Sequence, residues 1–564
     1  MTMEELKFEA PGKGPWEVDG THFPRPISPL SADAFAESFG KGFAVGTARF
    51  GLLLSHFKPG FVHGFFYQQP VPFGAPEGAM GPPPKFIFKL LTRLHPGMRK
   101  RIAAGKHAFA NKIWQEDLEK WDRDHKPASI KRMLGLQSVD LASLDNDKLV
   151  AHLDECRKLL SDMVYQHHIF TIPCCVPIGE FLVHVCEWTG KTPGEVLLAL
   201  KGSSRVSVGA AAPQLTSLGE AIRGDAGASE LLASSKAPGE ILDALRARED
   251  NIGELTREYI QHAGYRSVGY DVGDPYALEL PDLIVGAIRK SAKGEFDTNT
   301  DRGSKERIDA LKASVPTQHH AKFDELLKDA RTINRLRDER GIYSDTWATG
   351  ILRRAILAVG DRLKSAGKID DRELATDATY AELVSLLRGG SSPSSAELAK
   401  RAKHRKTATV ADVPPFLNAQ PSPPPPLDWL PADAQLPAKV VGMVISNIFG
   451  EPPKQVTETS VKGLPVSPGI YEGTARLVKS TDDFSKLQQG DVLVTRSTSP
   501  SFNVVLPLLG AIVTDRGGQL SHAAIVAREY GIPAVVGTTE GTKTLRDGAR
   551  VRVDGNTGDV RVIG

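Results

Sequence analysis

Residues 515–537 read DRGGQLSHAAIVAREYGIPAVVG, and this stretch decides the fold of the C-terminal part of the chain. The β-rich run at 511–514 leads into a Gly-Gly turn, and the small apolar residues that follow have a helical pattern. Gly531 and Pro533 are typical of a helix end. The stretch therefore predicts a strand, a turn, a helix and a second strand, with His522 at the N-terminus of the helix.

This position suits His522 to phosphoryl chemistry. The first-turn N–H groups of a helix are unpaired and its dipole favours negative charge, so a phosphate held there is stabilised. A neutral imidazole is a nucleophile near pH 7, and Gly517 and Gly518 let the backbone approach a phosphate without a Cβ. Ser521 adds a hydroxyl donor. A lone histidine at a helix start is more often structural, but the Gly-Gly turn, the helix and Arg528 together favour a phosphohistidine.

The stretch resembles the phosphohistidine-carrying mobile domain of the enzymes that use or make phosphoenolpyruvate. The resemblance runs from about Val461 to Gly564 and includes GLPVSPG at 463–469, GDVLV at 490–494, TSP at 498–500 and VDG at 553–555. Phosphoenolpyruvate synthase and pyruvate phosphate dikinase have a threonine two residues before the histidine, where this chain has Leu520. That difference shifts the resemblance toward rifampicin phosphotransferase and phenylphosphate synthase. It implies a swivelling α/β domain at 461–564 in which His522 carries the phosphoryl group.

Composition sets the limits for the rest of the chain. A length of 564 residues exceeds what one core usually organises, so about three domains are expected. The formal net charge of +2 gives no reason to propose nucleic acid or an anionic membrane as a partner. The four cysteines are too few and too spread for a disulfide framework. With no run of about 18 apolar residues and no signal peptide, we expect a cytoplasmic protein.

The N-terminal part, residues 1–90, is rich in proline, glycine and aromatic residues and poor in helical periodicity. We expect an irregular segment that packs on the next domain. Its stretch WEVDGTHFPRPISPL at 16–30 resembles the start of the acceptor-binding region of rifampicin phosphotransferase-like chains, which makes His22 and Arg25 candidates to face the acceptor. A rigid proline-rich loop is an equally good interpretation. The aromatic run at 61–67 is more typical of a core than of a pocket.

Residues 91–400 repeat apolar side chains at helical spacing, which predicts a mainly α-helical acceptor-binding domain. Arginines are dense from 331 to 362, and most are expected on solvated helix faces beside acidic residues. Relatives carry an arginine-rich helix followed by a Gly-x-Arg-Leu turn like residues 360–363. The resemblance, together with the fit of the guanidinium fork to phosphoryl oxygens, makes Arg354 and Arg362 acceptor-site candidates. His167 and His168 lack a regularly spaced third ligand, so no metal site is expected.

Proline and basic residues dominate from about 390 to 440, including PSPPPP at 421–426, so residues 401–460 are predicted to be a linker and hinge. A nucleotide loop is not evident. Gly190-Lys191-Thr192 imitates the end of a P-loop, but Val185 occupies the position of its first glycine. ATP and Mg²⁺ are therefore expected mainly on a stand-alone ATP-binding subunit.

The sequence thus predicts a multidomain protein with a mainly α-helical acceptor-binding domain and a C-terminal α/β swivelling domain. The resemblance implies one subunit of a two-component ATP-dependent phosphotransferase, arranged like phenylphosphate synthase. Its partner would charge His522 from ATP, releasing AMP and phosphate. Phospho-His522 would then donate to a hydroxyl, expected to be phenolic, of a small organic acceptor. A phosphocarrier or regulatory protein is an alternative that the large helical domain disfavours. A degenerate homologue with unrelated chemistry is a second alternative that Leu520 leaves open.

Overall fold

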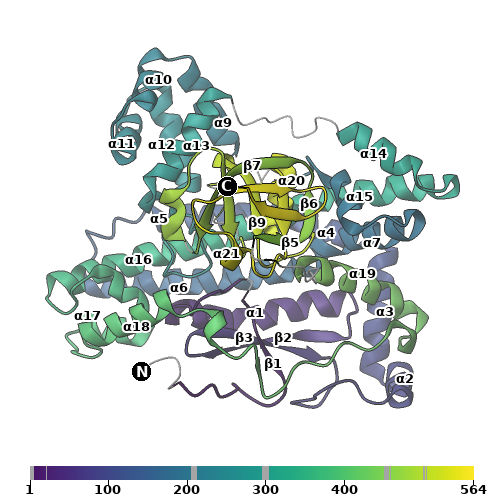
Figure 1. The fold of residues 1–564 in the computed structure, drawn as a ribbon. Helices are drawn as coiled ribbons and strands as arrows, with labels where there is room; N and C mark the ends of the chain where they lie inside the picture. Colours follow the sequence, from purple (N-terminus) through teal and green to yellow (C-terminus); the bar gives the residue numbers. More distant parts are fainter. Residues whose placement is uncertain are drawn as a thin grey trace. The chain divides into compact units, whose positions relative to one another are not determined.

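The computed structural model describes residues 6–20, 22–204, 212–294, 304–449, 457, 459–479, 481–498, 502 and 505–563. These residues form two compact units, and Figure 1 shows the elements that build them. The first unit contains residues 1–176, 270–274 and 343–441. The second contains residues 177–269, 275–342 and 442–564.

The first unit combines an antiparallel sheet with helices. Its strands are β1 (Trp16–Val18), β2 (Leu54–Val62), β3 (Phe65–Pro72) and β4 (Phe416–Leu417), in the order β2-β3-β1-β4. Helix α1 packs against both β2 and α6. The helices that lie wholly in this unit are α1 (Pro29–Arg49), α2 (Lys85–Leu94), α3 (Pro96–Ala110), α4 (Trp114–Lys120), α5 (Lys126–Gln137), α6 (Asn146–Ile169), α16 (Thr346–Ser365), α17 (Tyr380–Leu387) and α18 (Ser395–Thr407).

The structure corrects the prediction that residues 1–90 are irregular, because they contain α1 and three strands. Glycines hide the helical pattern of α1. A Cβ at Gly42 would lie 2.6 Å from the Cβ of His168, and one at Gly46 would lie 3.1 Å from Cγ1 of Ile172. Glycine therefore takes some of the buried positions of α1, and the apolar repeat that remains is Phe35, Phe39 and Phe43. Phe65, Phe66 and Tyr67 are fully buried, as their aromatic run indicated.

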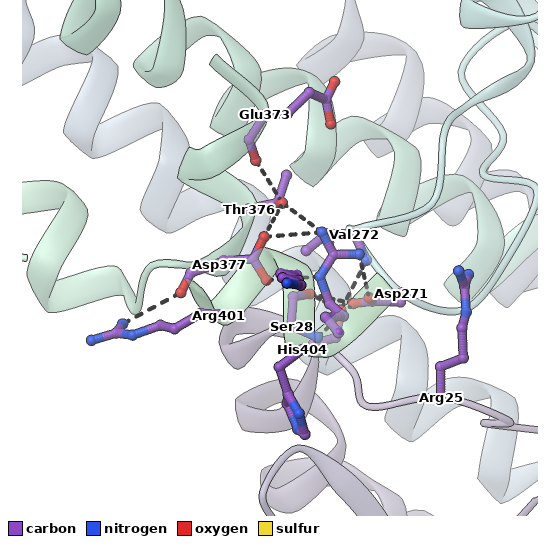
Figure 2. A network of polar contacts seen from close by, with 12 residues as sticks. Arg25, Ser28, Asp271, Val272, Glu373, Thr376, Asp377, Arg401 and His404 are labelled. Atoms are coloured by element: carbon purple, nitrogen blue, oxygen red, sulfur yellow. Dashed lines mark hydrogen bonds and ion pairs between the residues drawn. The ribbon is translucent and has the colours of Figure 1, made fainter. Parts of the chain in front are cut away.

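Residues 270–274 belong to the first unit although the segments on both sides belong to the second. A buried polar network fixes them there (Figure 2). The Ser28 N–H donates to Asp271 at 3.1 Å, and the Arg353 guanidinium donates to the Val272 carbonyl at 3.1 Å. Arg405, held by Asp377 at 2.8 Å, lies 3.8 Å from Asp271. Each buried charge in this network thus has an opposite charge beside it, as burial requires.

The second unit contains a helical part and a C-terminal domain. The helical part, residues 177–269 and 275–342, has a core built from residues such as Leu218, Ile222, Leu245 and Ile288. Its helices are α8 (Pro193–Leu197), α9 (Ala212–Arg223), α10 (Ala226–Ala233), α11 (Pro238–Ala247), α12 (Asn251–Ala263), α13 (Pro281–Lys293), α14 (Ser304–Ala313) and α15 (His320–Arg340). Helix α7 (Thr171–Thr189) includes the boundary at Val176–Pro177. The expected single helical domain at 91–400 is therefore divided, because its helices bury their apolar faces in different units.

The C-terminal domain confirms the predicted α/β fold. Its eight strands are β5 (Ser460–Lys462), β6 (Leu464–Ser467), β7 (Ile470–Val478), β8 (Asp491–Thr495), β9 (Leu509–Thr514), β10 (Ala534–Val536), β11 (Arg550–Asp554) and β12 (Asp559–Val562). The strand order is β5-β12-β11-β7-β8-β9-β10-β6, and β7, β8, β9 and β10 run parallel. Separate apolar clusters include Leu493 and Ile512 in one and Val492 and Val513 in the other, as alternation along a strand requires. Helices α20 (His522–Tyr530) and α21 (Gly541–Thr544) complete the domain.

The predicted linker at 401–460 contains more regular structure than its composition indicated. Helix α18 continues to Thr407, and α19 (Ala432–Phe449) accommodates Pro437 inside a helix. Residues 421–426 have no regular secondary structure. The role of this segment as a hinge stays a prediction, and residues 450–456 and 458 lie outside the described residues.

Among the residues that the structure describes, one segment, Asn146–Thr189, is long and apolar enough to cross a membrane by length and composition. Of its most apolar window, 72% is buried inside the structure. Such burial is also found for a core helix of a water-soluble domain, so the segment is weak evidence for a membrane span.

Candidate phosphohistidine site

His522 is the first residue of α20, as the sequence predicts, and the turn before it is built from glycine and serine. Gly517 has a φ of 110°, which favours glycine. Ser521 is the N-cap, and its hydroxyl accepts a hydrogen bond from the Ala524 N–H at 3.4 Å. Gly531 ends the helix with a φ of 67°. These features fix the imidazole at the positive end of the α20 dipole.

The surroundings of His522 keep its imidazole neutral. Burial lowers the pKa of His522 to about 4, with Arg337 acting in the same direction and Asp338 opposing it. The Thr498 hydroxyl lies 3.0 Å from Nδ1. At physiological pH the ring is therefore an uncharged nucleophile.

Arg337 and Asp338 come from the last turns of α15, in the helical part of the same unit. Nη2 of Arg337 donates to the Leu520 carbonyl at 2.9 Å, which places a guanidinium beside the residues that precede His522. Asp338 accepts a hydrogen bond from the Ser204 hydroxyl at 2.7 Å. The helical part thus contributes both a cation and a carboxylate to the electrostatic surroundings of the histidine.

The amides of the glycine turn are engaged by the end of α19. The Gly518 N–H donates to the Ile448 carbonyl at 2.9 Å, and the Leu520 N–H donates to the Asn447 carbonyl at 2.7 Å. A phosphate that used the Gly518 amide would have to displace Ile448. The roles of Gly517, Gly518 and Ser521 as a phosphate cradle therefore stay predictions.

Arg528 stabilises the same turn from inside the domain. Arg528 is 5% exposed, and its guanidinium donates to the carbonyls of Gln519 at 2.5 Å and Val466 at 3.3 Å. These contacts link α20 to β6 and to the turn that holds His522. Arg528 therefore has a structural role in holding this turn.

The N-terminal acceptor candidates have partners within the first unit. Nδ1 of His22 lies 2.8 Å from the Asp19 carboxylate, and the side chain is 45% exposed. Arg25 pairs with Asp274 at 3.2 Å, at the margin of the buried network in Figure 2. Both contacts stabilise a loop, and a role in acceptor binding stays a prediction.

The two acceptor-site candidates on α16, Arg354 and Arg362, also serve the packing of the first unit. Arg354 donates to the Val139 carbonyl at 2.7 Å. Arg362 donates to Asn146 at 2.9 Å and to the carbonyls of the loop before α6, including Leu144. The structure shows no direct evidence of phosphoryl chemistry at either residue. Arg337 of α15 does approach the histidine loop within the second unit, and the sequence placed it in the same dense run without singling it out.

His167 and His168, near the end of α6, lie inside the first unit. Nδ1 of His168 lies 2.8 Å from the Val164 carbonyl, and His167 lies 3.0 Å from Asp345. Among the residues that the structure describes, no group of three or more His, Cys, Asp or Glu side chains is placed to hold a metal ion. A surface depression of about 570 Å³ is lined by Asp122, Lys126, Pro127, Ile130, Lys131 and Leu134, and none of the acceptor candidates contributes to it.

Comparison with known proteins identifies two domains in the second unit. Residues 487–558 match the mobile domain of PEP-utilising enzymes, and residues 176–338 match the rifampicin phosphotransferase fourth domain. The first match contains His522, and the second contains Arg337 and Asp338. The expected resemblance to the mobile domain of PEP-utilising enzymes is therefore confirmed, and so is a resemblance of the helical part to a domain of rifampicin phosphotransferase.

Individual relatives agree with this domain content. The uncharacterized phosphotransferase YvkC of Bacillus subtilis is 30% identical over 316 residues, which are 54% of this chain and 36% of that protein. Rifampicin phosphotransferase of Streptomyces sp is 28% identical over 320 residues, 54% of this chain and 34% of that protein. Phosphoenolpyruvate synthase of Aeropyrum pernix is 49% identical over 104 residues, 18% of this chain and 13% of that enzyme. The chain thus spans no more than about a third of the length of these relatives.

Proposed function

We propose, from its mobile domain of PEP-utilising enzymes and its rifampicin phosphotransferase fourth domain, that the chain is the acceptor-binding and phosphohistidine component of an ATP-dependent phosphotransferase. The observation that carries this proposal is the neutral imidazole of His522 at a helix N-terminus, beside Arg337 and Asp338 of the other domain. A phosphohistidine requires a nucleophile of this kind, and its discharge requires a fixed cation nearby.

The first half-reaction charges the histidine. Nε2 of His522 attacks a phosphoryl group of the donor, the P–O bond to the donor breaks, and the leaving group departs with the electron pair. We assign Nε2 because Nδ1 contacts the Thr498 hydroxyl at 3.0 Å. The helix dipole then stabilises the phosphoryl oxygens.

The second half-reaction discharges phospho-His522 to an acceptor hydroxyl. The hydroxyl oxygen attacks phosphorus, the P–N bond breaks, and neutral imidazole is regenerated once the proton of the hydroxyl is removed. Arg337 neutralises charge on the phosphoryl oxygens, which are the main sites of charge in a loose transition state. We assign proton acceptance to Asp338, the carboxylate whose charge acts on His522.

The proposals for the phosphoryl acceptor and the phosphoryl donor are based on the named relatives. Rifampicin phosphotransferase among them suggests a small hydroxylated acceptor, and we propose a phenolic one. We further propose that ATP and Mg²⁺ bind a separate nucleotide-binding subunit, since no nucleotide loop was found in the sequence. We place the protein in the cytoplasm.

The test is to combine the full chain with ATP, Mg²⁺ and the nucleotide-binding protein encoded nearest to it. The products are followed with a panel of phenols and non-aromatic alcohols. Formation of AMP together with a phosphorylated phenol supports the proposal. AMP formation with only the alcohols phosphorylated would correct the acceptor class, and tight ATP binding by the chain alone would refute the two-component arrangement.

A further inference from the structure

We propose that Glu529 is a positioning residue that holds the C-terminal domain against the helical part of the second unit through the backbone amide of Gly202. This inference rests on the proposed function, because the arrangement it holds is the one in which the charges of Arg337 and Asp338 act on His522. A mobile domain must be both held and released during turnover, so the residue that sets this balance controls discharge.

The geometry places Glu529 on the same face of α20 as the histidine. It follows His522 by seven residues, about two helical turns. Its side chain is 5% exposed, and its Oε2 accepts a hydrogen bond from the Gly202 N–H at 2.9 Å. The contact joins the C-terminal domain directly to the loop that follows α8.

Helix α15 fixes the orientation of that loop. Arg331 donates to the carbonyls of Ala199 at 2.7 Å and Lys201 at 3.0 Å. Asn334 donates to the Ser203 hydroxyl at 2.9 Å. Gly202 itself has a φ of 81°, which favours glycine. The amide is therefore aimed at Glu529 before the domains meet, and the helix that presents it also carries Arg337 and Asp338.

Burial has the largest effect on the Glu529 carboxyl and raises its pKa to about 7. The hydrogen bond from the Gly202 amide acts in the opposite direction, as do Arg528 on α20 and Lys201 on the loop, whereas Asp338 on α15 adds to the rise. When the domain is released into water, the pKa of the Glu529 carboxyl returns toward its ordinary value of 4.5. Between pH 4.5 and 7, the Glu529 carboxyl therefore takes up a proton when the domain moves from the released to the held state. The held state becomes less stable as the pH rises through this range.

Two substitutions separate the hydrogen bond from the charge. Glu529→Gln keeps an oxygen that can accept from the Gly202 amide but removes the carboxylate. Glu529→Ala removes both. A buried amide left without an acceptor is unfavourable, so we expect the Gln variant to favour the held state over the Ala variant by on the order of tenfold.

The experiment measures the held fraction in the full chain by single-molecule fluorescence transfer. Dyes are attached at Glu240→Cys and Arg561→Cys, both exposed, in a Cys186→Ser background. The matched control is Glu472→Gln, an exposed glutamate on β7 of the same domain. We expect the control to match wild type.

The pH profile distinguishes positioning from a merely structural role. The held-state equilibrium constant of wild type divided by that of Glu529→Gln should fall by at least about tenfold between pH 4.5 and 7. His522 also titrates in this range, but its contribution is common to both proteins and cancels in the ratio.

Equal held fractions for Glu529→Gln and Glu529→Ala would overturn the proposal, as would a flat ratio across the pH range or an equal effect of Glu472→Gln. None of these measurements needs a nucleotide, a partner or an acceptor. They therefore decide the role of Glu529 separately from the question of whether His522 is phosphorylated.

Discussion

Replacing Arg337 with alanine should slow discharge of phospho-His522 while leaving the charging step nearly unchanged. Arg337 lies at the end of α15, donates to the Leu520 carbonyl at 2.9 Å and acts electrostatically on His522. Because it belongs to the helical part, it can serve the histidine only while the two domains are in contact. Charging takes place at the nucleotide site, where we expect this arginine to be absent.

The size of the effect follows from Coulomb's law. A unit positive charge about 5 Å from a phosphoryl oxygen, at an effective dielectric constant of about 20, contributes about 3 kcal/mol. If this stabilisation is largely confined to the transition state, its loss slows the step by roughly 100-fold. Arg337→Lys should recover only part of the rate, because lysine keeps the charge but not the planar fork.

The assay charges the chain chemically with phosphoramidate, so that no nucleotide-binding partner is required. Loss of acid-labile phosphate is then followed with and without the phenol to which wild type discharges. The matched control is Arg335→Ala, which removes an arginine from the same helix, where it pairs with Glu339 at 3.0 Å. If the two variants discharged at the same rate, Arg337 would have no special role, and its assignment to the discharge of phospho-His522 would be wrong.

Three further predictions concern the histidine and its domain. His522→Ala should abolish acid-labile labelling while changing the free energy of unfolding by less than about 1 kcal/mol, because alanine is well tolerated at the first position of a helix; labelling that persists in this variant would exclude the assignment. Labelling of wild type by phosphoramidate should stay constant from pH 8 to about pH 5 and fall near pH 4, because burial lowers the pKa of His522 to about 4; a midpoint near 6.5 would show that the imidazole is solvated. Deleting residues 421–426 should leave both units folded, as judged by unchanged circular dichroism, and slow one half-reaction more than the other. Unchanged rates for both would argue against a hinge in this segment.

The sequence was sufficient to predict the C-terminal domain and its histidine, because the signals there are local. A β-rich run, two glycines, an apolar helix and a glycine stop lie within about twenty consecutive residues. Each of these signals depends only on residues that are close to it in the chain. The structure has β9, α20 and β10 in that order, with His522 at the predicted position.

The N-terminal helix could not be predicted in the same way. In α1, Gly42 and Gly46 lie against α6 and Ile172 and interrupt an apolar repeat that consists of Phe35, Phe39 and Phe43, so periodicity is a weaker signal there. The prediction of an irregular linker at 401–460 was also wrong in part, because the segment contains helix α19. Pro437 suggests an irregular chain, yet it lies within α19, because the surrounding residues still favour a helix.

The acceptor-side residues depended on tertiary structure. Sequence alone determined that His522 starts a helix, because capping and helix dipole are properties of a few adjacent residues. It could not select Arg337 over Arg354 or Arg362, because all three lie on helices with the same local pattern. The packing of α15 against the C-terminal domain, within the second unit, brings Arg337 to the Leu520 carbonyl, 183 residues away in the chain.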